Sequence, residues 1–291
     1  MIKSLFKTKY SPLISILLII VLGLIIYSNT FQVPFQFDGR SYLVNNHSIR
    51  HITDVDAMIK RTGITRILAY LSFAANYHIH GYDVEGYHIV NLLIHIMNGL
   101  LVWALIKIIL ITPRFVAHFK EKDVLLVALA GALVFIAHPL QTQAVTYIYQ
   151  RLASMATFFY LICIYCYMVA RLIPTTCLKR HIFLGLSIIA ALAGMLTKQI
   201  TTTLPLMIMY LEFFLFPQAK RPKRFIGVLA IVLILLFIFV PFLHEFNIKA
   251  ILFRNLPPGA YVEGEITTWT YALTQVRVLI KYLSLILFPY A

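Results

Sequence analysis

Charged residues are scarce in this sequence. Asp, Glu, Lys and Arg together make up 12% of the 291 residues, and 11 side chains are acidic. Soluble domains carry about 25% charged residues, so the low share excludes a soluble globular protein. Hydrophobic residues reach 60% and the mean hydropathy is +0.84. This composition is typical of a protein that crosses a membrane several times.

Several other features are missing. The three cysteines, Cys163, Cys166 and Cys177, lie in or beside apolar runs, which excludes a disulfide framework and favours a packing role. No repeat of about 20 to 50 residues is visible, so the chain is not a solenoid. The first apolar run begins after basic residues, but no small-residue cleavage site follows Tyr27. We therefore expect a retained signal anchor.

Apolar runs recur along the whole chain. Each approaches the roughly 20 residues that a helix needs to cross the hydrocarbon of a bilayer. They predict an all-α bundle of about eight membrane spans: Pro12–Tyr27, His88–Ile111, Asp123–Ala137, Ser154–Leu172, Ile182–Leu196, Thr201–Phe216, Phe225–Leu243 and Trp269–Phe288. Residues 1–291 are expected to form a single transmembrane domain.

The basic residues are unevenly distributed among the loops. With the N-terminus in the cytoplasm, the inner side carries 14 Lys and Arg and three acidic residues, a net charge of +11, and the outer side carries +3. This positive-inside pattern gives the predicted orientation. The total charge of +14 therefore indicates topology and contact with anionic lipid, as at Lys220–Arg224, and argues against nucleic acid.

Two outer loops stand out by their length. Residues 28–87 are polar, and the apolar piece Arg66–Tyr77 within them is too short to cross, so it predicts a helix in the headgroup layer. Residues 244–268 contain Pro257-Pro258-Gly259 and are interpreted as a lid. At His138-Pro139 we expect a bend or a re-entrant turn, because proline cannot continue the preceding helix.

Polar side chains capable of chemistry gather at the outer ends of the spans. An ionisable group so close to the hydrocarbon costs free energy unless it has a function. We therefore expect one site on the non-cytoplasmic face, built from Asp38, His78, His80, Asp83, Glu85, His88, His138, Gln143, Arg151, Lys198 and Gln199.

Asp38 is the candidate general base for a hydroxyl, because it stands at the lipid boundary beside aromatic residues. An ion pair with Arg40 is the structural alternative. His88, Asn91 and His95 share one helical stripe, which faces protein or a wet cavity rather than lipid. Hydrogen bonding between helices is the alternative there. We expect His88 near the site and His95 in a structural role.

A metal site is weakly indicated. Glu85 and His88 form a Glu-x-x-His pair, but a di-iron bundle needs two such pairs and further carboxylates. A divalent cation is therefore left open, and no other cofactor is expected.

Four basic residues invite an anionic partner. Arg151 and Lys198 stand at the outer ends of spans, where desolvation makes an unpaired cation unfavourable and a phosphate suits the planar fork of arginine. Arg277 and Lys281 lie one turn apart inside the last apolar run. They predict either snorkelling to the headgroup layer or a pocket for a lipid phosphate.

A succession of short motifs resembles one family of membrane enzymes. The chain is similar to the membrane region of the transmembrane-and-tetratricopeptide-repeat O-mannosyltransferases and their bacterial relatives, which have the GT-C glycosyltransferase fold. The motifs follow in order over nearly the whole chain: Phe37-Asp38, Asn45-Asn46, Leu71–Tyr77, Gly86–His95, His138–Val145 with Arg151, and Lys198-Gln199.

The resemblance implies an inverting transferase for O-glycosylation, placed in a bacterial inner membrane. The donor would be a polyprenyl-phosphate-linked sugar, the acceptor a protein hydroxyl, and Asp38 matches the acidic base of the first outer loop. Asp83 or Glu85 is the alternative base. On this hypothesis the substrate-binding residues are Glu85, His88, Asn91, His138, Gln143, Arg151, Lys198, Gln199 and Arg277.

Three carboxylates of the family pattern are absent. Gly39, Gln143 and Gln199 stand where the family usually has an acidic residue. The alternative function is therefore a catalytically inactive GT-C-like scaffold or an accessory subunit with partner subunits in a larger membrane complex. A carrier for lipid-linked sugars is a third alternative, although the inner ends of the spans offer no polar path.

Overall fold

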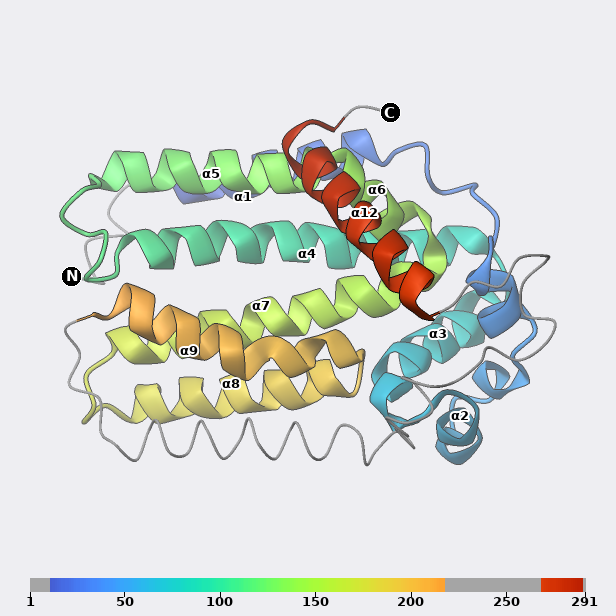
Figure 1. Cartoon of the computed structure of the whole chain (residues 1–291). Helices are drawn as coiled ribbons and strands as arrows, with labels where there is room; N and C mark the ends of the chain where they lie inside the picture. The colour runs from blue at the N-terminus through green and yellow to red at the C-terminus, as the bar shows by residue number, and fades with distance from the viewer. Residues whose placement is uncertain (1–10, 218–267, 290–291) are drawn as a thin grey trace. The chain divides into compact units, whose positions relative to one another are not determined.

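The computed structural model describes residues 11–217 and 268–289 (Figure 1). These residues fall into two units, Met1–Ala219 and Lys220–Ala291, and each unit is described by itself. Within the described ranges every regular element is helical. The all-α prediction is thereby confirmed for this part of the chain.

The longer helices are separated by short helical turns. The helices are α1 (Ser11–Ile26), α2 (Val55–Thr62), α3 (Ile67–His80), α4 (Val84–Leu110), α5 (Glu121–Ala137), α6 (Thr142–Thr146), α7 (Arg151–Leu172), α8 (Leu178–Met195), α9 (Leu204–Leu215) and α12 (Thr268–Leu287). The turns are η2 (Arg40–Val44), η3 (His47–Arg50), η4 (Ile64–Arg66), η5 (Pro139–Gln141), η6 (Ile148–Gln150) and η7 (Gln199–Thr203).

By length and composition, three helices could cross a membrane: α4, the segment Ile148–Leu172 and α8. The bent pair of α5 with Pro139–Thr146 gives a fourth if it forms one span. Helices α1 and α9 are apolar but shorter, and α12 is not among the helices whose length and apolar composition suit a membrane span. Residues 225–243 lie outside the described part. These long apolar helices indicate that the chain is an integral membrane protein. The eight-span arrangement stays a prediction.

Helix α4 is the centre of the first unit. It packs between α5 and α7, while α1 lies along α4 and α5, and α8 lies along α7 (Figure 1). Gly99 of α4 permits this closeness, because a Cβ there would collide with the side chain of Ile136 in α5. Small residues serve this purpose in membrane bundles, where backbones must approach to gain packing.

Two local predictions are confirmed. A helix forms at Ile67–His80, and the axis bends by 53° between α5 and Pro139–Thr146. The backbone N–H of Leu68 donates to the carbonyl of Leu196 at 3.0 Å, which joins the start of α3 to the end of α8. The location of α3 in the headgroup layer stays a prediction.

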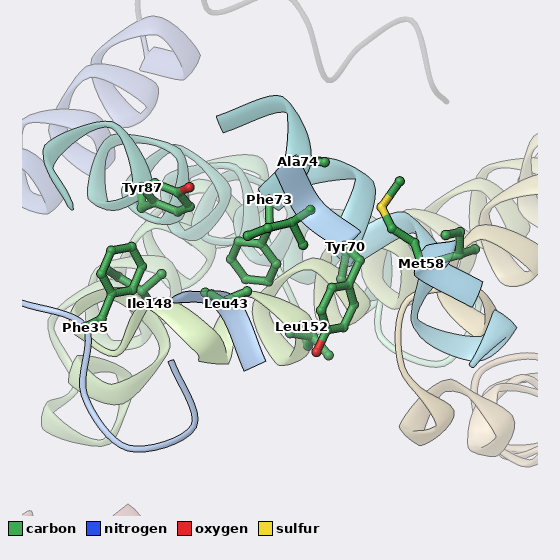
Figure 2. Packing of buried hydrophobic residues seen from close by; sticks show 12 residues of the cluster. Phe35, Leu43, Met58, Tyr70, Phe73, Ala74, Tyr87, Ile148 and Leu152 are labelled. Carbon is green, nitrogen blue, oxygen red and sulfur yellow. The ribbon is translucent and has the colours of Figure 1, made fainter. Parts of the chain in front are cut away.

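A hydrophobic cluster that includes four aromatic rings fills the end of the bundle next to α3. Figure 2 shows Phe73 and Tyr70 of α3 side by side with Tyr87 of α4, Phe35 of the loop after α1, and Leu43 of η2. Phe35 meets Tyr87 edge to face, with ring centres 5.2 Å apart. Burying such rings is a large source of stability. The cluster therefore fixes the loop on which Asp38 lies against the helices.

Candidate functional site

Arg151, the first residue of α7, lies wholly inside the protein, with 0% of its side chain exposed. It makes five hydrogen bonds. Nε donates to Asn91 Oδ1 at 2.7 Å, Nη1 to Asn76 Oδ1 at 2.6 Å and to the carbonyl and hydroxyl of Ser72, and Nη2 to the carbonyl of Tyr87 at 2.9 Å. All these acceptors are neutral, so the positive charge is solvated by dipoles rather than by a carboxylate.

The surroundings of Arg151 leave little room for a ligand. Its guanidinium carbon lies 4.4 Å from the centre of the Phe73 ring and 5.6 Å from that of Tyr87, in cation–π geometry. Its partners come from α3 and α4, so it ties both helices to α7. We therefore no longer expect Arg151 to bind the phosphate. In our hypothesis it positions the helices that carry the site.

The stripe His88, Asn91 and His95 is buried, as its spacing on one face of a helix predicts. Asn91 donates to the carbonyls of Val145 and Ile148 at 3.2 and 3.3 Å. His88 Nε2 lies 2.8 Å from the carbonyl of Val33, and His95 Nε2 lies 3.3 Å from that of Ile136. These contacts join α4 to its neighbours, which is the structural role that we expected for His95 and not for His88.

Asp38 lies in the loop after α1, with its side chain exposed. Its backbone N–H donates to the Tyr147 hydroxyl at 3.0 Å, which ties this loop to the connection between α6 and α7. Burial raises the pKa of the Tyr147 hydroxyl. The hydrogen bond from the Asp38 N–H offsets part of this rise, and the negative charge of the Asp38 carboxylate adds to it. Tyr147 therefore stays neutral beside the carboxylate. In the described residues no ion pair joins Asp38 to Arg40.

Two half-buried cations, Arg66 and Lys198, lie near each other, and Arg66 also lies near Tyr70 and Tyr149. The charge of Arg66 acts on Lys198 and on the Tyr149 hydroxyl, and the charge of Asp38 acts on Tyr147 and Tyr149. Burial lowers the pKa of Lys198, and the like charge of Arg66 lowers it further. Two neighbouring cations in a partly desolvated place favour an anion. We name Asp38, Arg66, Tyr147, Tyr149 and Lys198 the Asp38 cluster.

A stack of rings connects the Asp38 cluster to the buried arginine. Tyr42 lies on Tyr149 with ring centres 5.4 Å apart and an interplanar angle of 18°, and Tyr149 lies on Phe73 at 6.5 Å and 6°. The hydroxyls of Tyr149 and Tyr70 are 3.1 Å apart. Arg151 lies over Phe73, at the other end of this stack. We therefore expect a substitution of Arg151 to shift the packing of Tyr149 through the Phe73 ring.

The other predicted residues are distributed around this end of the first unit or lie beyond it. Gln143 is exposed on α6 one turn before Tyr147, and Gln199 is half-buried beside Lys198. Glu85 is exposed in the first turn of α4, and Nδ1 of His138 accepts from the N–H of Leu140 at 3.3 Å. Arg277 is exposed on α12 in the second unit, so its relation to the Asp38 cluster stays untested.

A metal centre has no geometric support in the described ranges. No group of three or more His, Cys, Asp or Glu side chains there could hold an ion. His88 is buried, whereas His78, His80, Asp83 and Glu85 are exposed around the turn from α3 to α4. The Asp38 cluster is thus a site of one carboxylate, two cations and tyrosine hydroxyls.

Sequence reasoning missed Arg66, Tyr147 and Tyr149 as members of the site. One signal could have identified Arg66: it immediately precedes α3, and a cation at a helix N-terminus opposes the helix dipole. Such a residue is expected to have a separate use, for example an anionic ligand. The two tyrosines carry no comparable signal, because aromatic residues are common at membrane interfaces.

In residues 11–217 and 268–289 the fold and the site thus define a helical integral membrane protein with a carboxylate and two cations at one end of the bundle. The chain is similar to protein O-mannosyl-transferase Tmtc1 of Drosophila melanogaster, with 27% identity over 200 residues, covering 62% of this chain and 21% of that protein. It is also similar to protein O-mannosyl-transferase tmtc2 of Xenopus laevis, with 31% identity over 54% of this chain and 19% of the relative. For TMTC2 of Homo sapiens the identity is 30%, over 50% of this chain and 18% of the relative.

These distant homologues support the resemblance seen in the motifs. The chain spans about a fifth of the length of the curated relatives that it matches. No family model matches the chain, and no solved structure matches it.

Proposed function

We propose that this protein is a membrane glycosyltransferase that moves a mannosyl group from a polyprenyl-phosphate donor to a Ser or Thr hydroxyl of a protein. The mannosyl group and the protein acceptor come from the names of the homologues. The active site lies on the non-cytoplasmic face, with the N-terminus in the cytoplasm, because the basic residues sort to the opposite loops. A bacterial inner membrane is the expected location.

The chemistry is a single displacement at the anomeric carbon. Asp38 accepts the proton of the acceptor hydroxyl as its oxygen bonds to the anomeric carbon. The bond from that carbon to the phosphate oxygen breaks, and the polyprenyl phosphate leaves with the electron pair. Arg66 and Lys198 stabilise the charge that the phosphate gains, and the configuration is inverted, by analogy with inverting glycosidases.

One observation carries the proposal: the Asp38 loop, Tyr147 and Tyr149 meet near Arg66, and Lys198 lies near Arg66 in turn. The N–H of Asp38 donates to Tyr147, and the charges of Asp38 and Arg66 both act on Tyr149. A general base and cations for a leaving phosphate are the two things this displacement needs. Arg151, held by neutral partners, is assigned to positioning.

The test is transfer by the purified protein in detergent, with a polyprenyl-phosphate mannose as donor and a Thr-containing peptide as acceptor. Asp38→Asn should lower turnover at least a hundredfold, the lower end of what a general base contributes, and leave the melting temperature unchanged. The matched control is Asp56→Asn, which makes the same change at an exposed carboxylate of α2 outside the Asp38 cluster and should retain turnover. Full turnover in Asp38→Asn would refute the role of Asp38.

The accessory-subunit alternative rests on Gly39, Gln143 and Gln199, where the family pattern has acids. It predicts no transfer by the wild-type protein with any lipid-linked mannose, and stable partner subunits after mild extraction from the membrane. Transfer by the purified chain alone would exclude it.

A further inference from the structure

Phe37 is the unusual residue of the Asp38 loop. Its φ is +44°, and no other residue in the described ranges except glycine has a positive φ. A bulky side chain is strained in this region, which glycine enters freely. The ring is also 80% exposed, the highest value among the large exposed apolar side chains of the described residues. Phe37 therefore combines backbone strain with an apolar side chain left exposed at the protein surface.

Neither the turn nor the core explains the ring. The turn is closed by backbone hydrogen bonds, from Gly39 N–H to the carbonyl of Gln36 at 2.8 Å and from Arg40 N–H to that of Phe37 at 3.1 Å. Glycine at position 37 would make the same turn without strain. The ring touches Tyr147 edge to face, with centres 6.0 Å apart, and this contact leaves most of its surface exposed. Strain that persists at a functional loop points to a role there.

We propose that Phe37 binds the acceptor polypeptide and selects an apolar side chain next to the accepting Ser or Thr. This inference rests on the proposed transferase function. Asp38 must reach the acceptor hydroxyl, and the Cα atoms of adjacent residues are about 3.8 Å apart. An extended acceptor advances about 3.3 Å per residue, so the neighbour of the accepting residue comes within reach of the Phe37 ring.

The donor is a less suitable occupant of this position. Its phosphate is assigned to Arg66 and Lys198, whereas Phe37 adjoins Asp38, the residue assigned to the acceptor hydroxyl. A phenyl ring has no hydrogen-bonding group, so it selects by burial of apolar area. An acceptor with Val or Pro beside Thr gains from this burial, and one with Gly on both sides does not.

The experiment compares two peptide acceptors with the full-length protein in detergent and a polyprenyl-phosphate mannose donor. One peptide has Val and Pro around its Thr, and the other has Gly at both positions. The wild type should have a KM about tenfold lower for the apolar peptide, equal to about 1.4 kcal/mol of binding. Phe37→Asn, which tolerates a positive φ but has no ring, should lose this difference in KM.

Two further variants complete the test. Phe37→Tyr retains the ring and should retain the preference, and Phe37→Asn should melt no lower than the wild type because strain is relieved. The matched control is Ile79→Asn, which removes an apolar side chain of α3 that is 71% exposed outside the Asp38 cluster, and it should keep the wild-type preference.

The outcomes separate the two proposals. An undiminished preference in Phe37→Asn would overturn this inference alone, and it is the result expected if the ring rests in lipid. Absence of transfer to either peptide by the wild type would overturn the proposed function, and this inference with it.

Discussion

Helix α7 carries an arginine near each end, Arg151 buried and Arg171 partly buried, and their hydrogen-bond partners differ in charge. In the last turn, Arg171 forms a two-pronged ion pair with Glu212, with both N–O distances 2.7 Å, and Tyr167 donates to the same carboxylate at 2.7 Å. At the first residue, Arg151 donates hydrogen bonds to neutral oxygens alone. The charge is cancelled at one end of the helix and left uncancelled at the other.

The difference indicates where the protein tolerates an electrostatic cost. A buried charge without a counter-charge costs several kcal/mol even when it is hydrogen-bonded, and such charges in membrane proteins mark functional places. Arg151 lies behind the ring stack that leads to the Asp38 cluster. We infer that its field adds to those of Arg66 and Lys198 and favours an anion at this end of the bundle.

The largest expected effect comes from removing the neutral cradle, by which we mean the uncharged oxygens that accept hydrogen bonds from Arg151, on Ser72, Asn76, Tyr87 and Asn91. Arg151→Met keeps an apolar stem but removes all five hydrogen bonds, and leaves the amides of Asn76 and Asn91 with unpaired buried oxygens. Unpaired buried groups of this kind cost about 1 to 3 kcal/mol each. The free energy of unfolding should therefore fall by about 3 to 5 kcal/mol, which denaturant unfolding in detergent would measure.

Arg151→Lys is the comparison variant for this measurement. It keeps the charge but not the planar fork that reaches Asn91, Asn76 and Tyr87 together. Its loss should be smaller than that of Arg151→Met. If Arg151→Met unfolds within about 1 kcal/mol of the wild type, a value typical of a surface change, the cradle does not hold the three helices together.

The positions of the helices in the first unit were largely predictable from the sequence. The apolar run Asp123–Ala137 ends at His138-Pro139, where proline requires the break that is observed as a 53° bend. The spacing of His88, Asn91 and His95 gave their burial on one helical face. These features are local, since hydrophobic periodicity and proline act within a single helix.

The site was predictable only in its candidates, because the contacts that build it are not local. Arg151 is bonded to Asn76 and Ser72, which precede it by 75 and 79 residues, and Asp38 meets Tyr147 across 109 residues. Periodicity says which face of a helix is polar, but not which helix lies opposite that face. The sequence therefore predicted an anion at Arg151, whereas the structure fills its fork with neutral partners.

A second prediction makes the two ends of α7 alike. Asn76→Asp would give Arg151 a carboxylate, as Arg171 has in Glu212, and would lose one hydrogen bond, from Asn76 Nδ2 to the carbonyl of Gly86 at 3.1 Å. The new ion pair with Arg151 and the lost hydrogen bond to Gly86 should nearly cancel in the free energy of unfolding. The affinity for a short-chain polyprenyl phosphate should fall about fivefold, or about 1 kcal/mol, because the field of Arg151 is cancelled. Fluorescence titration in detergent would measure it.

The control for that change is Asn45→Asp, which adds the same charge at an exposed position directly after η2. Screening by salt and water keeps the effect of an exposed charge small. Equal losses of affinity in Asn76→Asp and Asn45→Asp would mean that total charge, rather than the uncancelled Arg151, decides anion binding.

The smallest expected effect is a pH dependence at Lys198. Burial and the nearby Arg66 lower the pKa of Lys198 in the folded protein below the ordinary lysine value of about 10.4. Between the lowered pKa and the ordinary value, the unfolded chain binds more protons than the folded one, so the contribution of Lys198 to stability rises with pH. A bound phosphate works in the opposite direction, because it favours the charged lysine and its affinity falls as the pH rises.

The melting temperatures of the wild type and Lys198→Met, measured from about pH 7 to about pH 10, would test both signs. Without phosphate, the wild type should gain stability relative to Lys198→Met as the pH rises. With a short-chain polyprenyl phosphate, the wild type should lose that gain at the alkaline end. Lys179→Met, at the exposed start of α8, should follow the wild type throughout. Parallel curves for the wild type with and without phosphate would remove Lys198 from the anion site and leave Arg66 as the cation beside Asp38.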